Sequence, residues 1–204
     1  RPGEGRVSTA RPPMELAAVF REPLPRSGRP LDDVLVRLER EVIAESNRLT
    51  HPRSMGHQVS APLAAAVWAE ALTGALNQSG AVWEMSPAGT VIETQVVRWM
   101  CGLAGFGPDS GGTFTSGGTE ATFAGLLAAR HALMPDAWTR GMGASLLPVV
   151  VCGEHAHYGV ARAVGELGLG TDRIAVVPSR DFRIDVAALE STLNRLARDG
   201  RSGL

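Results

Sequence analysis

The sequence contains no lysine, because all 20 residues counted as lysine or arginine are arginine. Chemistry that depends on an ε-amine, such as a Schiff base or the phosphate contact of a Walker loop, cannot be completed by this chain alone. Cysteine is scarce as well, since Cys101 and Cys152 are too few for a disulfide framework or a cysteine-based metal cluster. This cysteine usage fits a reducing compartment.

Long apolar runs and a strong net charge are also absent. No stretch approaches the roughly 20 apolar residues of a membrane-spanning helix, and the first residues contain no apolar signal segment. The formal net charge of -1 provides no basic field for nucleic acid or an anionic membrane surface. Since 44% of the residues are hydrophobic, we expect a globular protein with a sizeable core. Without a predicted membrane span or signal segment, the cytoplasm is the expected location.

Both ends of the sequence differ from those of a complete protein. Position 1 is not methionine, and residues 199–204 have the pattern of a helix stop followed by the approach to another strand. We therefore expect the chain to be the N-terminal part of a longer protein.

The first half of the chain alternates between loop-like and helical patterns. Proline, glycine and arginine recur through residues 1–30 without an apolar period, which predicts an extended arm or linker. Apolar residues at helical spacing follow, separated by polar loops over 51–62 and 78–89. We expect helices over Leu31–Leu49, from about residue 63 to Asn77, over Thr90–Leu103 and over Glu120–Met134.

The second half alternates strands with helices. Leu146–Cys152 is a short continuous apolar run, typical of a buried parallel strand, and Arg173–Val177 is a second predicted strand. A helix with Val160, Val164 and Leu167 on one face lies between them, and Val186–Ala197 predicts another. The fold class is therefore α/β with a mainly parallel sheet flanked by helices, connected by right-handed crossovers.

A glycine-rich turn opens the helix predicted from Glu120. In Ser116-Gly117-Gly118-Thr119, the glycines allow close approach of a ligand to the backbone, and the helix start presents unpaired N–H groups that favour a phosphate. The alternative is a tight turn in which Thr119 only caps the helix. Dinucleotide-binding fingerprints, Walker loops and nucleophile elbows are not found in the sequence.

A histidine pair follows the first predicted strand, in Glu154-His155-Ala156-His157-Tyr158. Ligands of open parallel sheets bind outside the carboxyl ends of the strands, so a histidine here is placed to stack on a flat aromatic ligand. Two alternatives remain open: a structural histidine bonded within its loop, and a metal site built on the His-x-His spacing.

Several separated motifs together resemble the group II pyridoxal-dependent decarboxylases, which include the glutamate, aromatic-amino-acid, diaminobutyrate and cysteine-sulfinate decarboxylases. The resemblance begins at about residue 31 and continues to the C-terminus. The motifs are His51-Pro52-Arg53, Asn77, Glu84 to Glu93, Thr113 to Thr122 with Ala129-Arg130, and His155-Ala156-His157-Tyr158.

The resemblance implies a fold-type I enzyme with pyridoxal 5′-phosphate (PLP) as cofactor. Residues 31–104 would form the N-terminal helical segment and the start of the large domain, and 105–204 an incomplete PLP-binding large domain. The resemblance implies that the cofactor phosphate is bound by Ser116, Gly117, Gly118 and Thr119, and that His157 is the catalytic residue that stacks on the pyridine ring. The implied substrate-binding residues are Gln58 and Ser60. No metal is implied.

The resemblance also has gaps. Ser54 and Met55 stand where family members commonly have aromatic residues, which changes the expected shape of the substrate pocket. Glu84, Ser86 and Pro87 match a family signature, either for packing at a subunit interface or for the site. The Schiff-base lysine and the aspartate that pairs with the pyridinium nitrogen lie, in this family, beyond the region that this sequence matches.

The implied activity is decarboxylation of an L-amino acid to an amine and carbon dioxide, in a homodimer with shared active sites. The 204-residue chain alone would be inactive, because it has no Schiff-base lysine. Two alternatives remain: a non-catalytic protein that keeps the PLP fold, and a PLP-dependent lyase or aminotransferase of the same fold.

Overall fold

The computed structural model describes residues 5–143, 148–201 and 203, and the chain divides into two units, Arg1–Ser79 and Gly80–Leu204.

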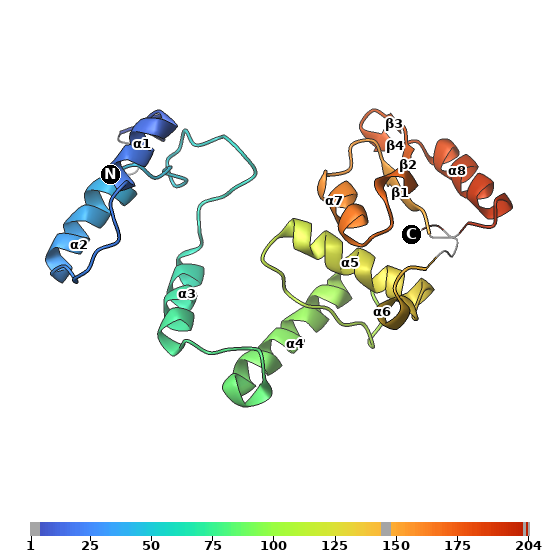
Figure 1. Cartoon of the computed structure of the whole chain (residues 1–204), viewed down its shortest axis with the longest axis horizontal. Coiled ribbons are helices and arrows are strands. Elements are labelled where there is room, and N and C mark those ends of the chain that lie inside the picture. Colours follow the sequence, from blue (N-terminus) through green and yellow to red (C-terminus); the bar gives the residue numbers. More distant parts are fainter. Residues whose placement is uncertain (1–4, 144–147, 202, 204) are drawn as a thin grey trace. The chain divides into compact units, whose positions relative to one another are not determined.

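The first unit is built from short helices (Figure 1). Helix α1 lies inside the segment predicted to be an extended arm, and it begins at a proline, whose fixed φ suits the first helical position. The helix expected over Leu31–Leu49 ends earlier, at Ile43, after a change from α-helical to π-helical hydrogen bonding. The elements are α1 (Pro13–Phe20), α2 (Leu31–Arg37), η1 (Leu38–Ile43) and α3 (Ala64–Leu76).

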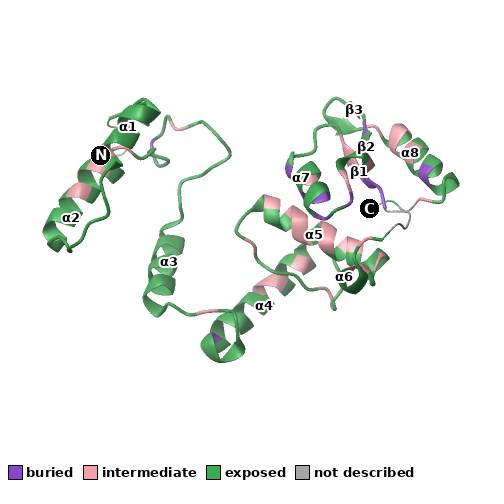
Figure 2. Cartoon of the chain, in the orientation of Figure 1, coloured by how far each residue is buried: buried purple, intermediate pink, exposed green. Residues whose placement is uncertain are grey.

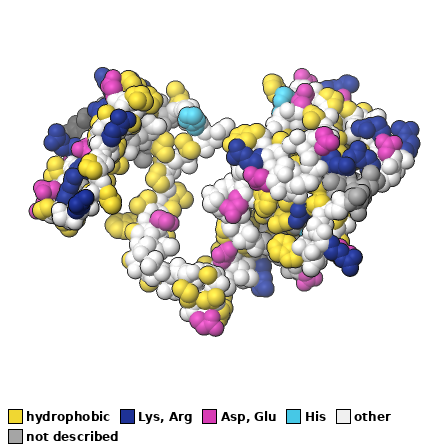
Figure 3. All heavy atoms as spheres, viewed as in Figure 1, with side chains coloured by type: hydrophobic (Ala, Val, Ile, Leu, Met, Phe, Trp, Pro, Cys, Tyr) yellow, Lys and Arg dark blue, Asp and Glu magenta, His cyan; other side chains and the backbone are white. Residues whose placement is uncertain are grey.

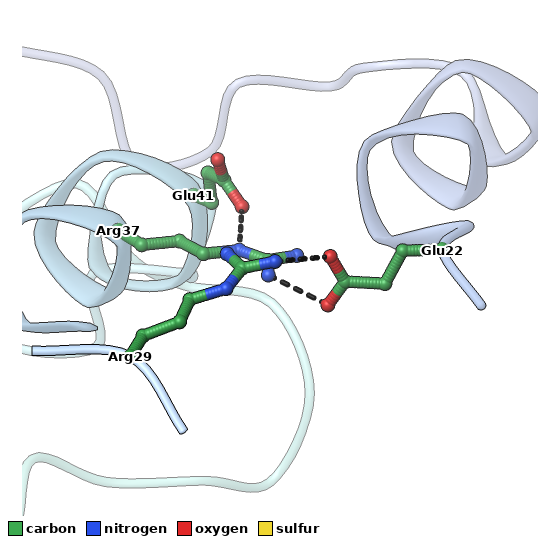
Figure 4. Close-up of polar contacts among 4 residues, drawn as sticks. All are labelled: Glu22, Arg29, Arg37 and Glu41. Carbon is green, nitrogen blue, oxygen red and sulfur yellow. Dashed lines mark hydrogen bonds and ion pairs between the residues drawn. The ribbon is translucent and has the colours of Figure 1, made fainter. Parts of the chain in front are cut away.

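Ion pairs connect the segment that precedes α2 to α2. The Glu22 carboxylate accepts hydrogen bonds from Arg29 at 2.9 Å and from Arg37 at 2.7 Å, and Arg37 also donates to Glu41 at 2.6 Å (Figure 4). The Arg37 guanidinium lowers the pKa of Glu22, and hydrogen bonds to Glu22 and then Glu41 raise the pKa of Arg37. The predicted arm is thus tied to a helix through side chains rather than through an apolar core.

Helix α3 shows how little of the first unit is buried. The helix ends where Asn77 adopts a left-handed conformation, a usual stop for a helix. None of its residues is buried, and Val67, Trp68, Leu72 and Leu76 are all exposed. Hydrophobic side chains consequently form part of the visible surface in Figure 3.

The second unit contains all the strands of the described part of the chain. Helix α4 starts at Pro87, earlier than expected, and α5 starts at Gly118, directly after the glycine-rich turn. The elements are η2 (Trp83–Met85), α4 (Pro87–Leu103), α5 (Gly118–Leu133), α6 (Ala137–Arg140), β1 (Val150–Gly153), α7 (Gly159–Glu166), η3 (Thr171–Arg173), β2 (Ile174–Val177), β3 (Ser179–Arg180), β4 (Arg183–Ile184) and α8 (Val186–Arg198).

Strands β1 and β2 are parallel, as the sequence predicts, and α7 connects them. Val150 is opposite Ile174, and the register continues to Gly153 opposite Val177. An isolated parallel bridge joins Val149 to Gly203, so the chain returns beside β1 after α8. The first predicted strand began at Leu146; residues 144–147 lie outside the described residues, and β1 itself begins at Val150.

The core of the second unit lies between α5, α7 and the strands. Helices α5 and α7 pack against each other, and buried positions lie in α7, in the loop after it and at the start of β1 (Figure 2). The helices contribute apolar residues at the helical period, and β1 contributes a short apolar run of which Val150 is buried and the rest is half-buried. The core residues are Val150, Val164, Leu167 and Leu169, with Phe123, Leu126, Leu127, Met142, Val160 and Ile174 partly buried against them.

A small antiparallel hairpin, β3 with β4, was not predicted. Its two-residue turn, Asp181-Phe182, has positive φ at both positions, the conformation of a tight hairpin turn. Such turns are usually recognised by Asn-Gly or Asp-Gly, and a phenylalanine at the second position gives no such signal.

In the described part of the chain, no helix is both long enough and apolar enough to cross a membrane.

Candidate functional site

The start of α5 is organised by a serine and a glutamate one helical turn apart. Both the backbone N–H and the hydroxyl of Ser116 donate to the Glu120 carboxylate, at 2.8 and 2.6 Å. The Ser116 hydroxyl and then its backbone N–H lower the pKa of Glu120. The carboxylate therefore remains charged at the helix end where a negative charge is favourable, and it fixes the turn that precedes α5.

The backbone beyond this turn is accessible. Gly117 is the N-cap of α5, and among the described residues no side chain caps the helix. A Cβ placed on Gly117 or Gly118 would meet no atom within 4 Å. No side chain therefore fills the space beside these two glycines, and the first N–H groups of α5 have no side-chain cap, which leaves them for a ligand such as a phosphate.

His157 lies in the turn between β1 and α7, and its ring orientation is fixed by the backbone. The N–H of Gly159 donates to His157 Nδ1 at 3.0 Å, and the N–H of Val160 donates to the His157 carbonyl at 3.0 Å. Because Nδ1 accepts a hydrogen bond, the neutral imidazole carries its proton on Nε2. The Tyr158 ring lies beside the imidazole, with 4.1 Å between the ring centroids.

Thr119 and His157 meet at Gly159. A Cβ added to this glycine would lie 2.9 Å from His157 Nδ1 and 3.5 Å from Thr119 Oγ1, so both groups lie close to one point. The packing of α7 on α5 brings together two residues that are far apart in the sequence. Thr119 and His157 therefore lie close to each other, and each of them lines a pocket.

Two open pockets adjoin this meeting point. One, of about 390 Å³, is lined by residues 116–120 together with Phe123, Arg162 and Glu166. The other, of about 360 Å³, lies on the strand side, and its lining includes Cys152 and Val176. The second pocket is also lined by Gly153, Glu154, Ala156, His157, Tyr158, Val160, Ala161, Thr171 and Ile174.

His155 has a different environment from His157. Glu154 accepts a hydrogen bond from the Ser179 N–H at 2.6 Å and lies 3.9 Å from His155 Nε2, while the His155 ring lies 5.5 Å from that of Phe182. These contacts connect the loop after β1 to the hairpin. No group of three or more His, Cys, Asp or Glu residues suited to a metal ion occurs within the described ranges.

The remaining predicted residues fall elsewhere. Gln58 and Ser60 are exposed residues of the segment between η1 and α3, in the first unit, and their substrate role stays a prediction. Ser86 is only 7% exposed, and its carbonyl accepts from both the N–H and the hydroxyl of Thr90 at the start of α4. This contact gives Ser86 a structural part in starting α4.

The sequence reasoning missed the parts played by Glu120, Gly159 and Arg162. A signal existed for Glu120, since a serine four residues before a glutamate at a helix start permits this contact. Gly159 and Arg162 join the site only through the packing of α7 on α5, which depends on contacts that are distant in the sequence.

The fold and these groups are those of an α/β protein whose site, at the carboxyl end of parallel strands, suits a phosphorylated, flat small molecule. A family model described as "Pyridoxal-dependent decarboxylase conserved domain" matches residues 13–202. The chain belongs to this family, and the family's cofactor is PLP.

The similar sequences are decarboxylases. An L-2,4-diaminobutyrate decarboxylase of Rhizobium meliloti is 33% identical over 181 residues, covering 88% of this chain and 35% of the relative. Its namesake from Acinetobacter baumannii is 30% identical over 190 residues, covering 86% of this chain and 37% of the relative. This chain therefore spans just over a third of the length of these relatives.

Solved structures give the same family fold. Mouse CSAD has a TM-score of 0.90 at 26% identity, covering 99% of this chain and 42% of that one. The glutamate decarboxylase domain of a diaminobutyrate-pyruvate transaminase and L-2,4-diaminobutyrate decarboxylase from Vibrio parahaemolyticus has a TM-score of 0.88 at 27% identity, covering 97% of this chain and 45% of that one. The expected fold, part of a fold-type I PLP enzyme, is confirmed.

Proposed function

We propose that this protein, in its full-length form, decarboxylates an L-amino acid to an amine and carbon dioxide with PLP as cofactor. The observation that carries the proposal is the meeting of Thr119 Oγ1 and His157 Nδ1 at Gly159, beside an uncapped helix start. Family membership adds support, because the relatives of 30% identity or more reported above are named as decarboxylases.

The residues of this chain fit the cofactor by their chemistry. Gly118 and Thr119 offer N–H and hydroxyl donors to the phosphate at the positive end of the α5 dipole. Ser116 and Gly117 shape the turn, with the Ser116 hydroxyl committed to Glu120. His157 offers a flat, oriented ring to the pyridine.

When bound, the cofactor supplies an electron sink for the bond to be broken. The role of this chain is to bind and to orient. The Gly159 N–H keeps the His157 proton on Nε2, and the donors of α5 hold the phosphate end of the ligand in place. Since the sequence has no lysine, the anchoring amine must come from outside residues 1–204.

The candidate substrates are the amino acids on which the relatives act. We expect Gln58 and Ser60 to contact the substrate carboxylate, as family resemblance implies. The test uses full-length protein with PLP and a panel of L-2,4-diaminobutyrate, L-aspartate, L-glutamate and aromatic amino acids. We expect one of these to yield equal amounts of carbon dioxide and the matching amine; transamination products instead would contradict the proposal.

A second candidate function is favoured by the absence of lysine. It is a non-catalytic protein that keeps the PLP fold for binding or assembly. Full-length protein that binds PLP without a reducible covalent link, and releases no carbon dioxide from any amino acid of the panel, would support this candidate over the first.

We also propose a homodimer with active sites shared between subunits, and a cytoplasmic location. The exposed apolar residues of α3 and α4 support the dimer, since no residue of either helix is buried within the described chain. Sedimentation of the full-length protein and cell fractionation test these two expectations.

A further inference from the structure

The charged side chains around the phosphate end of the site are two acids and one base. The 390 Å³ pocket at the start of α5 is lined by residues 116–120, Phe123, Arg162 and Glu166. Two of these are acids, Glu120 and Glu166, while Arg162 is the one basic residue that lines this pocket.

A phosphate at this helix start would lie near a fixed negative charge. Glu120 holds its charge firmly, because its hydrogen bonds from Ser116 lower its pKa. A phosphate monoester carries between one and two negative charges near neutral pH. Repulsion from Glu120 and Glu166 therefore opposes part of the attraction from the α5 dipole, and a nearby cation is needed to offset it.

Arg162 is positioned to supply that cation. It belongs to α7, three residues after Gly159, where α7 packs on α5. Its guanidinium carbon lies 5.1 Å from the centroid of the Tyr158 ring, and no ion pair of Arg162 occurs among the described residues. Stacking over a ring face leaves the N–H edge of a guanidinium free, and that edge matches the geometry of a phosphate.

We propose that Arg162 binds the phosphate group of the cofactor, offsetting the charges of Glu120 and Glu166, and that the Tyr158 ring holds the guanidinium ready for this contact. The inference rests on the proposed function, since it assumes that PLP occupies the start of α5. It goes further by assigning a side-chain cation to a phosphate site otherwise made of backbone N–H groups and hydroxyls.

The test compares PLP with pyridoxal, which has the same ring and aldehyde but no phosphate. Dissociation constants of both are measured by equilibrium titration of full-length wild type, Arg162→Gln, Arg162→Lys and a control, Arg195→Gln, which removes an exposed arginine of α8. We expect Arg162→Gln to weaken PLP binding about tenfold or more, as loss of a charged hydrogen bond implies, with pyridoxal binding unchanged. Arg162→Lys should retain much of the PLP affinity, and Arg195→Gln all of it.

Two results would overturn the inference. Equal weakening of PLP and pyridoxal in Arg162→Gln would show that Arg162 only supports the Tyr158 and His157 rings, and unchanged PLP affinity would show that it does not contact the phosphate. Circular dichroism of Arg162→Gln, together with the affinity of Arg162→Lys, distinguishes a folding defect from loss of the phosphate contact. Wild-type protein that binds neither compound would instead contradict the proposed function itself.

Discussion

Single residues decide which ligand this site can hold. Gly159 contributes a backbone N–H to His157, and the space where its side chain would stand is bordered by His157 and Thr119. The backbone thereby orients the imidazole ring.

We expect His157 to contribute ring stacking rather than charge. His157→Ala should raise the dissociation constant of PLP for the full-length protein by about 2- to 12-fold, the usual range for one stacked aromatic pair. His157→Phe keeps a flat ring and should lie closer to wild type in fluorescence titrations. His155→Ala is the matched control, since that ring contacts Glu154 and Phe182, and an equal loss in the control would contradict the assignment.

At the residue scale, the sequence predicted Thr119 and His157 as a pair, and the structure brings them to one point. Patterns within a few residues could reveal a glycine-rich helix start and a histidine after a strand. Arg162 had no such pattern, because an exposed arginine on a helix is usually solvated. Its place beside the start of α5 follows from the packing of two helices, which no local window contains.

At the scale of elements, helix starts were predicted best where a strong local signal exists. α8 begins one residue after Asp185, whose carboxylate accepts from the Ala188 N–H at 3.1 Å and pairs with Arg180 at 2.6 Å. α1 and the hairpin were missed, because their signals, a proline pair and an Asp-Phe turn, are common in irregular segments as well.

We expect the ionised Asp185 carboxylate to stabilise the fold, so that the free energy of unfolding falls in acid. The Ala188 N–H, and further Arg180, lower the pKa of Asp185, so this contribution is present above the unfolded-state value of about 4 and is lost as pH falls. Asp185→Asn should lower the urea midpoint at pH 7 and show a smaller further drop between pH 5 and pH 3 than wild type. Asp199→Asn, at the C-terminal cap of α8, is the control and should not lower the midpoint at pH 7.

At the scale of the whole molecule, burial is uneven. The described core is confined to the second unit, while α1 to α4 contain no buried residue (Figure 2). The alternation of strands and helices was enough to predict this α/β unit, because the apolar residues of α7 recur at the helical period and those of β1 form a continuous run. Composition alone predicted a sizeable core, but it could not locate that core.

The core of the second unit should be sensitive to loss of volume. Leu169 is 2% exposed, and we expect Leu169→Ala to reduce the free energy of unfolding by about 2–5 kcal/mol in urea denaturation. Leu24→Ala removes the same atoms from a side chain that is 89% exposed, and it should change stability by less than about 0.5 kcal/mol. Equal effects would contradict the burial described for α7 and its following loop.

The parallel bridge between Val149 and Gly203 has a consequence for how the sheet is assembled. β1 is paired with β2 through α7, so its first neighbour comes from a nearby part of the chain, and the bridge brings a later segment to β1. Contacts between residues close in sequence form at a lower entropic cost than distant ones. We therefore expect the β1–β2 pair to form before the bridge to residue 203, and substitutions that weaken this pair should slow folding.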